Sequence, residues 1–163
     1  MEFRTYGQVD PYDVLRLNML ALDFPFTPQA AAALRQHDRR FSEGLAVYAV
    51  VDGAVAGQVG MLTAQAETVA GPVTVGAVWA VATLPAFGRR GIARALMERA
   101  EEELRAMGCV AVTLGTSRSR VAHRLYQSMG YEDILPVQRA FCFAEAVAAP
   151  SITVRPAAAG DLE

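Results

Sequence analysis

The stretch PVTVGAVWAVATLPAFGRRGIARALMERAEEELRAMGCVAVTL, residues 72–114, decides the fold. Its first part, residues 72–84, is almost continuously apolar, which is typical of a strand covered on both faces and therefore central in a sheet. Pro85 ends this strand, and the apolar positions that follow recur every three or four residues, as on one face of an amphipathic helix. Gly108 ends that helix, and residues 109–114 form a second buried strand. A strand, a helix and a strand in this order predict a right-handed parallel crossover.

The rest of the chain up to residue 146 supplies shorter elements on either side of this unit. A hairpin is predicted at Asp52-Gly53, because this dipeptide tolerates the positive φ angles of a two-residue turn. Further elements are expected as strands at residues 2–6, 131–135 and 138–146, and as helices from Asp10, from Thr27 and over residues 121–129. This order predicts an α/β (α+β) fold, with a mixed, mostly antiparallel sheet of six to seven strands and helices on both faces.

The composition fits one globular domain outside the membrane. Of the 163 residues, 53% are hydrophobic, which is too many for an intrinsically disordered chain. Apolar stretches are interrupted within about ten residues, whereas a membrane helix needs about 20. The N-terminus, Met1–Arg4, carries an acid and lacks the apolar run of a secretory signal. We therefore expect a cytoplasmic protein without a membrane partner.

Charge and cysteine usage argue against two further classes of site. The formal net charge is −2, whereas a nucleic-acid-binding domain is usually strongly basic, so no nucleic-acid partner is expected. Cys109 and Cys142 have neither a CxxC spacing nor a neighbouring paired His. No metal site and no disulfide are therefore predicted, and both thiols are expected to be buried.

The segment Gly88-Arg89-Arg90-Gly91-Ile92-Ala93-Arg94 opens the helix that follows Pro85 and places three arginines near its first turn. Unpaired N–H groups and the positive end of the helix dipole make such a turn an anion site, and glycine lets a phosphate approach the backbone closely. The segment lacks the GK[ST] of a P-loop. Two interpretations stay open at this point: a phosphate-binding turn, or a solvated helix start whose arginines serve solubility.

Two motifs resemble those of the Gcn5-related N-acetyltransferase (GNAT) family. The first is the strand end Val-x-Thr-x-Pro at residues 81–85 together with RRGIARALM at residues 89–97. The second is A-x-x-L-Y-x-x-x-G-Y at residues 122–131. The order of elements over residues 1–146 is also similar to that of the family. The resemblance implies acetyl-CoA as co-substrate and a sheet whose central parallel strands splay apart.

The resemblance also implies roles for individual residues. In the family, main-chain N–H groups of the helix start bind the pyrophosphate of acetyl-CoA, and the end of the preceding strand binds the pantetheine arm. The implied residues are Arg89, Arg90, Gly91, Ile92, Ala93 and Arg94 for the pyrophosphate, Val81, Ala82 and Thr83 for the pantetheine, and Ser119 where the family often has Asn. Gly88 stands where the family has Gln or Arg, which removes one side-chain contact.

Tyr126 falls where the family has the tyrosine that protonates the departing thiolate, so the resemblance implies a general acid there. Taken by its position alone, a Tyr on the apolar face of a helix is a core residue. The general base stays unassigned, because residues 73–84 contain no ionisable side chain. Glu67, Asp38 and Glu43 are candidates for facing the acceptor, and the alternative for each is a solvated loop acid.

Three further side chains are expected to be structural. His37 and His123 fit the surface of helices, although both could titrate near neutral pH. Trp79 fits the core of the central strand, with the lining of the acceptor pocket as the alternative.

The tail divides the chain into an acetyltransferase domain at residues 1–147 and a second part at residues 148–163. The run SITVRPAAAGDLE at residues 151–163 is similar to the start of a GNAT domain, so we expect a linker and the first strand of a second, truncated domain. Alternatively, this strand pairs within the domain or with a second copy of the chain, which would give a homodimer.

The predicted function is an acetyl-CoA-dependent N-acetyltransferase. It would transfer the acetyl group by direct attack of a primary amine carried by a small molecule or a peptide. The alternative is a catalytically silent acyl-CoA-binding half of a tandem GNAT protein, which the missing base, Gly88 and Ser119 favour.

Overall fold

The computed structural model describes residues 1–37 and 46–135. The strand expected at residues 138–146, the tail at 148–163 and Cys142 lie outside the described residues. The elements are β1 (Glu2–Arg4), a 3-10 turn (Tyr6–Gln8), α1 (Pro11–Leu22), α2 (Pro28–His37), β2 (Ala46–Val51), β3 (Ala54–Thr68), β4 (Gly71–Thr83), a 3-10 turn (Pro85–Phe87), α3 (Ile92–Ala106), β5 (Ala111–Leu114) and α4 (Val121–Gln127).

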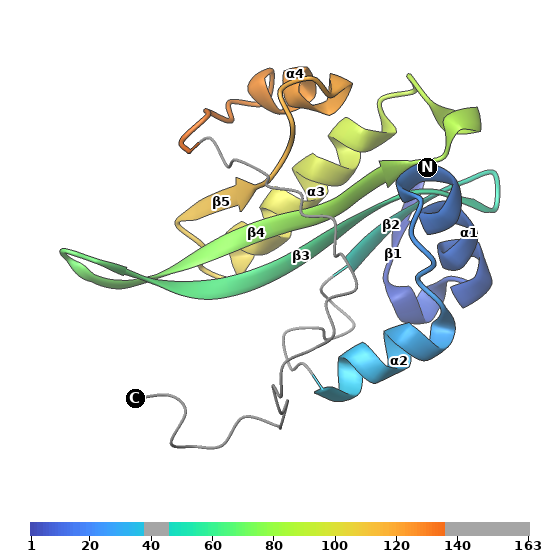
Figure 1. Cartoon of the computed structure of the whole chain (residues 1–163), viewed down its shortest axis with the longest axis horizontal. Coiled ribbons are helices and arrows are strands. Elements are labelled where there is room, and N and C mark those ends of the chain that lie inside the picture. The colour runs from blue at the N-terminus through green and yellow to red at the C-terminus, as the bar shows by residue number, and fades with distance from the viewer. Residues whose placement is uncertain (38–45, 136–163) are drawn as a thin grey trace, which may run out of the picture.

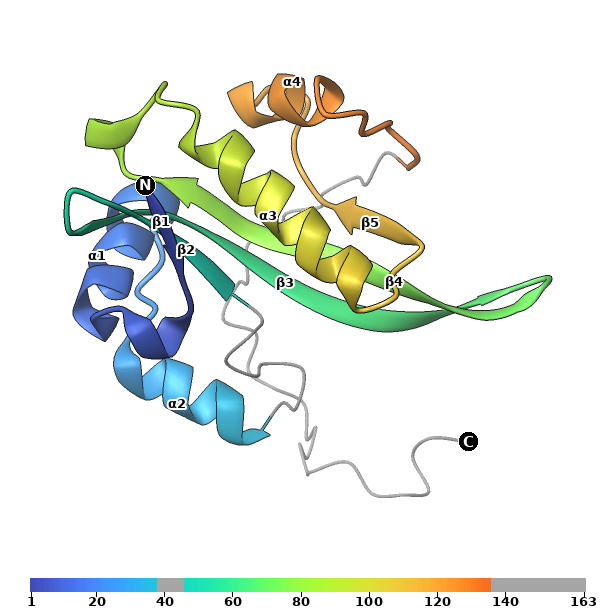
Figure 2. The same cartoon turned by 180° about the vertical axis from the view of Figure 1, so that it is seen from behind.

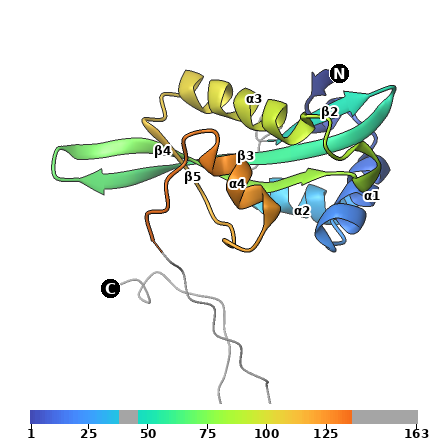
Figure 3. The same ribbon diagram turned by 90° about the horizontal axis from the view of Figure 1, so that it is seen from above.

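The described strands form one mixed sheet in the order β1-β2-β3-β4-β5. Only β4 and β5 are parallel, with Val75–Val78 opposite Ala111–Leu114, and α3 makes the connection between them. This confirms the predicted crossover and the interior position of β4. The helices α1 and α2 lie on one face of the sheet, and α3 crosses β3 and β4 on the other (Figures 1 and 2). Figure 3 shows α3 and α2 on opposite sides of the strands.

Local signals explain where several elements begin and turn. The carboxylate of Asp10 accepts a hydrogen bond from the Tyr12 N–H (2.8 Å) and caps α1, whose first residue is Pro11. Asp52 and Gly53 have φ angles of 51° and 79°, as the predicted two-residue turn between β2 and β3 requires. No helix within the described residues is both long and apolar enough to cross a bilayer.

The strand expected at residues 131–135 is not formed. The described residues give a sheet of five strands, and the other expected strand, at residues 138–146, lies outside them. The main-chain N–H of Tyr131 donates to the carbonyl of Tyr126 (3.1 Å), and its hydroxyl donates to Glu101 of α3 (2.9 Å). These bonds hold the start of this segment against α3 and α4, so its backbone does not pair with a strand of the sheet.

The hairpin of β3 and β4 is longer than predicted. β3 continues to Thr68, and the ribbon extends well beyond the other strands (Figure 1). Its turn is closed by Thr68, whose hydroxyl donates to the carbonyl of Gly71 (2.7 Å). The apolar sequence pattern of β3 ends near residue 62, because the part of the ribbon beyond this residue is mostly exposed to solvent and buries little surface.

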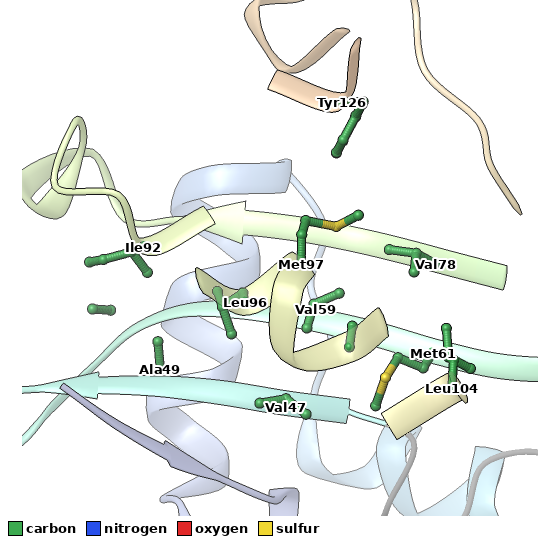
Figure 4. Packing of buried hydrophobic residues seen from close by; sticks show 12 residues of the cluster. Val47, Ala49, Val59, Met61, Val78, Ile92, Leu96, Met97, Leu104 and Tyr126 are labelled. Atoms are coloured by element: carbon green, nitrogen blue, oxygen red, sulfur yellow. The ribbon is translucent and has the colours of Figure 1, made fainter. Parts of the chain in front are cut away.

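The main core lies between α3 and the sheet (Figure 4). Gly76 allows this close packing, because a Cβ there would lie 2.8 Å from Cδ1 of Leu104. The fully buried side chains that fill this layer are Val59, Met61, Leu96, Met97 and Leu104. Cys109 packs against the same cluster but is only partly buried, so the expected full burial of its thiol is wrong.

We expect Leu104→Ala to lower the free energy of unfolding by about 2–5 kcal/mol, because it opens a cavity under the crossover helix. Leu20→Ala on the exposed side of α1 is the matched control and should change it by less than about 0.5 kcal/mol. Urea denaturation of both variants measures the difference. Equal losses would contradict the packing described for α3.

Candidate active site

The central feature of the site is a β-bulge in β4. Gln58 lies opposite Ala82, but two residues further along β3, Gly60 lies opposite Trp79, so β4 holds one extra residue in this interval. Ala80 carries the irregularity with a left-handed φ of 47°. This conformation costs an alanine about 1–2 kcal/mol, so the surroundings must stabilise it.

The bulge changes which edge of β4 the main-chain groups face. Leu84 N–H donates to the carbonyl of Ala56 (2.8 Å), so by alternation Ala82 also pairs toward β3. The main-chain groups of Val81 and Thr83 therefore point to the opposite edge. Along that edge the ladder with β5 ends at Val78, so in the described chain no strand covers the last residues of β4. This open edge is the splay between the parallel strands that the resemblance implies.

One buried hydroxyl at this edge has no hydrogen-bond partner among the described residues. It is Oγ1 of Thr83, which lies opposite Gly57 in the register. A Cβ at Gly57 would lie 3.0 Å from Leu96 and 3.1 Å from Ile92, so this pair of positions faces the start of α3. A buried hydroxyl without a partner is costly, which makes Thr83 a candidate for contact with a ligand.

Two buried amides hold the bulge from the other face of the sheet. Asn18 of α1 and Gln58 of β3 exchange a pair of hydrogen bonds, each 3.0 Å long. Gln58 Nε2 also donates to the carbonyl of Ala80 (3.3 Å), and Asn18 Nδ2 donates to the carbonyl of Val14 (2.9 Å). The sequence reasoning missed this network. Its only signal is one amide side chain inside an apolar strand and another on the apolar face of a helix.

A pocket of about 280 Å³ lies beside the bulge on the α1 face. Trp79 lines it and is 37% exposed, so the expected core position of Trp79 is wrong and the alternative, a pocket wall, is what the structure shows. The indole occupies the space above Gly60, where a Cβ would overlap the ring. The residues around the pocket are Asn18, Leu22, Phe24, Phe26, Ala46, Tyr48, Gln58, Val59, Gly60, Trp79 and Ala80.

The loop after β4 presents a row of unpaired main-chain donors. The first intrahelical bond of α3 runs from Ala95 N–H to the carbonyl of Gly91 (3.0 Å), so the N–H groups of residues 89–94 have no acceptor within the described chain. Arg89 and Gly91 have φ angles of 60° and 76°, which turn the backbone sharply before the helix. Both arginines ahead of Gly91 are exposed, and the guanidinium of Arg90 lies 5.3 Å from the ring centre of Phe87.

Arg94 differs from its neighbours because its side chain is directed toward α4. Its Nη2 donates to the hydroxyl of Ser128 (2.6 Å), and Nη1 lies 3.8 Å from the carboxylate of Glu98. Arg94 therefore offers only its main-chain N–H to the pyrophosphate that the resemblance implies. Its guanidinium joins the start of α3 to the end of α4.

Tyr126 of α4 reaches into the core that α3 covers and is 7% exposed (Figure 4). Its ring contacts Tyr131 edge to face, with the ring centres 5.9 Å apart. Burial raises the pKa of the Tyr126 hydroxyl, and the charge of Arg120 opposes this shift. The hydroxyl is therefore protonated at neutral pH, as a proton donor must be.

His123, on the same helix, is 9% exposed, so the expected position on the helix surface is wrong. Its Nε2 donates to Oδ1 of Asp133 (2.9 Å), and Nε of Arg118 donates to Oδ2 (2.9 Å). The hydrogen bond from His123 is the main cause that holds the pKa of Asp133 below its usual range. Ser119 lies exposed in the loop between these partners, with its hydroxyl 2.8 Å from that of Ser117.

The candidate bases do not gather at the bulge. Glu67 lies at the exposed end of the ribbon, about 30 Å along β3 from Gln58 at ~3.3 Å per residue, so it is not part of this site. Asp38 and Glu43 lie outside the described residues. His37 is exposed at the end of α2, as expected. Burial raises the pKa of the Tyr48 hydroxyl in the pocket wall, so this phenol is not a base at neutral pH.

Comparison with known proteins agrees with this geometry. The model of the acetyltransferase (GNAT) family matches residues 12–131. No curated protein matches the chain. An acetyltransferase from Trypanosoma brucei superposes with a TM-score of 0.67 at 22% identity, covering 86% of this chain and 99% of its own. The ribosomal-protein-S18-alanine N-acetyltransferase from Escherichia coli gives a TM-score of 0.62 at 20% identity, covering 82% and 79%.

A third similar structure was solved with a ligand. It is AAC(6')-Iy in complex with the bisubstrate analogue CoA-S-monomethyl-acetylneamine, with a TM-score of 0.60 at 20% identity. The superposition covers 86% of this chain and 98% of that one. At these identities the three structures show the fold.

We expect Ala80→Gly to raise the free energy of unfolding by up to about 1 kcal/mol, because glycine adopts the left-handed conformation without strain. Ala82→Gly, two residues along the same strand and buried, is the control and should lower it by about 1 kcal/mol. Urea denaturation distinguishes the two. If both glycines destabilised the protein equally, the bulge would not be centred on Ala80.

Proposed function

The chain belongs to the acetyltransferase (GNAT) family, and on that premise we propose that it transfers the acetyl group of acetyl-CoA directly to a primary amine of a small molecule or peptide. The observation that carries the proposal is the open edge of β4, which leads from the bulge at Ala80 to the unpaired N–H groups before α3. This arrangement offers one continuous path for an extended ligand that ends in a diphosphate.

The residues present fit the diphosphate of acetyl-CoA. A helix start with unpaired N–H groups and a positive dipole end stabilises phosphate oxygens. Arg89 and Arg90 add two exposed positive charges at the same turn. Since Arg94 is engaged with Ser128 and Glu98, the proposed contacts are the main chain of residues 89–94 and the side chains of the first two arginines.

Val81 and Thr83 would hold the pantetheine arm. Their main-chain groups face the open edge, so an extended amide chain could pair with them as an added strand does. The unpartnered hydroxyl of Thr83 would gain a hydrogen bond from the same ligand. Ala82 faces the other way and packs in the core with α1, so of the three strand residues it contributes least to this contact.

Acetyl-CoA supplies a thioester whose carbonyl carbon accepts the amine nitrogen. As the new C–N bond forms, the C–S bond breaks and the sulfur leaves as a thiolate that needs a proton. Tyr126 would donate that proton, because burial of this residue raises the pKa of its hydroxyl and keeps it protonated at neutral pH. The amine gives its own proton to a base that stays unassigned, because no carboxylate of the described chain lines the pocket.

We expect Tyr126→Phe to lower kcat by about 100-fold, because it removes the proton donor for the leaving thiolate. The KM for acetyl-CoA should stay nearly constant, since the ring and its packing remain. Thiol release with a saturating acceptor measures both values. Tyr12→Phe, at an exposed tyrosine of α1, is the control. A kcat within a few-fold of the unmodified enzyme would exclude Tyr126 as the acid.

The double variant Arg89→Glu with Arg90→Glu should weaken acetyl-CoA binding at least about tenfold, because it places two negative charges beside the diphosphate. Its melting temperature should not change, since both side chains are exposed. The control, Arg99→Glu with Arg105→Glu, makes the same change in net charge further along α3. Calorimetric titration at two salt concentrations measures the affinity. Equal weakening in the control would refute a local role for the loop.

A further inference from the structure

The pocket beside the bulge has a composition that selects among amines. We infer that the acceptor is a small primary amine carried on an aromatic or compact aliphatic body, in preference to a polycationic sugar or a peptide terminus. The inference rests on the proposed acetyl transfer and names the substrate class of the same site.

The walls of the pocket are largely aromatic. Phe24 and Phe26 follow α1 and stack with their ring centres 6.4 Å apart and their planes 24° from parallel. Trp79 and Tyr48 contribute two further rings from neighbouring parts of the sheet. An aromatic or aliphatic group placed among such rings gains buried apolar contact and ring stacking, so the lining favours a ligand with an apolar body.

The two amides in the lining offer no spare donors to a polar ligand. Both N–H groups of Asn18 are used, one on the carbonyl of Val14 and one on Gln58. Gln58 also uses both of its N–H groups, on Asn18 and on the carbonyl of Ala80. A sugar hydroxyl that entered the pocket would lose its water without gaining these donors, which disfavours it.

The charge and the volume of the pocket favour the same class of acceptor. None of the residues that line the pocket in the described part of the chain carries a charge at neutral pH. A ligand with several ammonium groups would be desolvated there without a carboxylate to pair with. The volume of about 280 Å³ lies at the lower end of ligand pockets, so a body with one ring suits it.

The position of the pocket next to the bulge also suits the acceptor. Trp79 and Ala80 line it and belong to the bulge itself, while the next residue, Val81, turns its main-chain groups to the open edge. An amine held among the rings would therefore lie beside the bulge, where the path proposed for the thioester begins. The amide network of Asn18 and Gln58 holds the pocket at this place, because it joins α1 to the bulge.

Steady-state acetylation of three acceptors tests the substrate class: 2-phenylethylamine, neamine, and a tripeptide with a free N-terminal alanine. We expect kcat/KM for 2-phenylethylamine to exceed the other two values at least about tenfold, the scale on which apolar pockets discriminate. Preference for neamine or for the tripeptide would overturn the inference and leave the acetyl transfer intact.

Binding can be measured without catalysis, because Trp79 is the only tryptophan of the chain. Titration of the full chain with 2-phenylethylamine should change the tryptophan emission saturably at millimolar concentrations or below. A change in emission without thiol release from any acceptor would support the pocket and overturn the proposed acetyl transfer. No change in emission over this range would overturn the inference, whatever the activity with other amines.

A glutamate introduced at one of two equally exposed residues, one inside the pocket lining and one outside it, gives a matched pair of variants. Phe24 and Met19 are both 55% exposed, but only Phe24 lines the pocket. Phe24→Glu should lower kcat/KM for 2-phenylethylamine at least about tenfold and raise the relative rate with neamine, whereas Met19→Glu should leave both unchanged. Melting temperatures of the two variants show that folding is retained. Equal effects at both positions would overturn the assignment of this pocket to the acceptor.

Discussion

The extra residue at Ala80 determines which way the last part of β4 faces. In an antiparallel ladder, main-chain groups alternate between the two neighbouring strands, so inserting one residue inverts the alternation for all residues after it. Gly76 and Val78 belong to the part of β4 that pairs with β5, and beyond the bulge Val81 and Thr83 face the same edge after β5 has ended. The end of β5 leaves this edge open, and the bulge makes Val81 and Thr83, in place of Ala80 and Ala82, the residues whose main-chain groups face it.

This geometry depends on residues that lie far away in the sequence. The left-handed conformation of Ala80 lowers the stability of the fold by about 1–2 kcal/mol, and one hydrogen bond from Gln58 offsets about 1 kcal/mol of this cost. The reciprocal bonds with Asn18 hold Gln58 in the orientation that reaches the Ala80 carbonyl. Because Asn18 belongs to α1, the helix that borders the pocket and the strand that borders the open edge are connected through two buried amides.

Local signals in the sequence account for most of the fold. The Asp10 cap, the Asp52-Gly53 turn and the apolar face of residues 92–107 each depend on nearby residues, and the structure confirms the elements they predict. The bulge has no such signal, since its residues are apolar and none is glycine. Trp79 and His123 were misplaced for a related reason. Their positions depend on Gly60 and on Asp133, which no local pattern connects to them.

The proposed acid and the proposed anion site are parts of one framework built on α3. Arg94, in the first turn of α3, bonds to Ser128 at the end of α4, and Glu101, two turns later, accepts a hydrogen bond from Tyr131 just beyond α4. Tyr126 precedes both Ser128 and Tyr131, by two and five residues, and its ring packs edge to face on Tyr131. A shift of α3 would therefore move the helix start and the tyrosine together. A direct transfer needs the leaving sulfur and its proton donor at a fixed distance from each other. Because α3 is bonded to both Ser128 and Tyr131, the phenol of Tyr126 on the short helix α4 can donate a proton to a ligand bound at the start of α3.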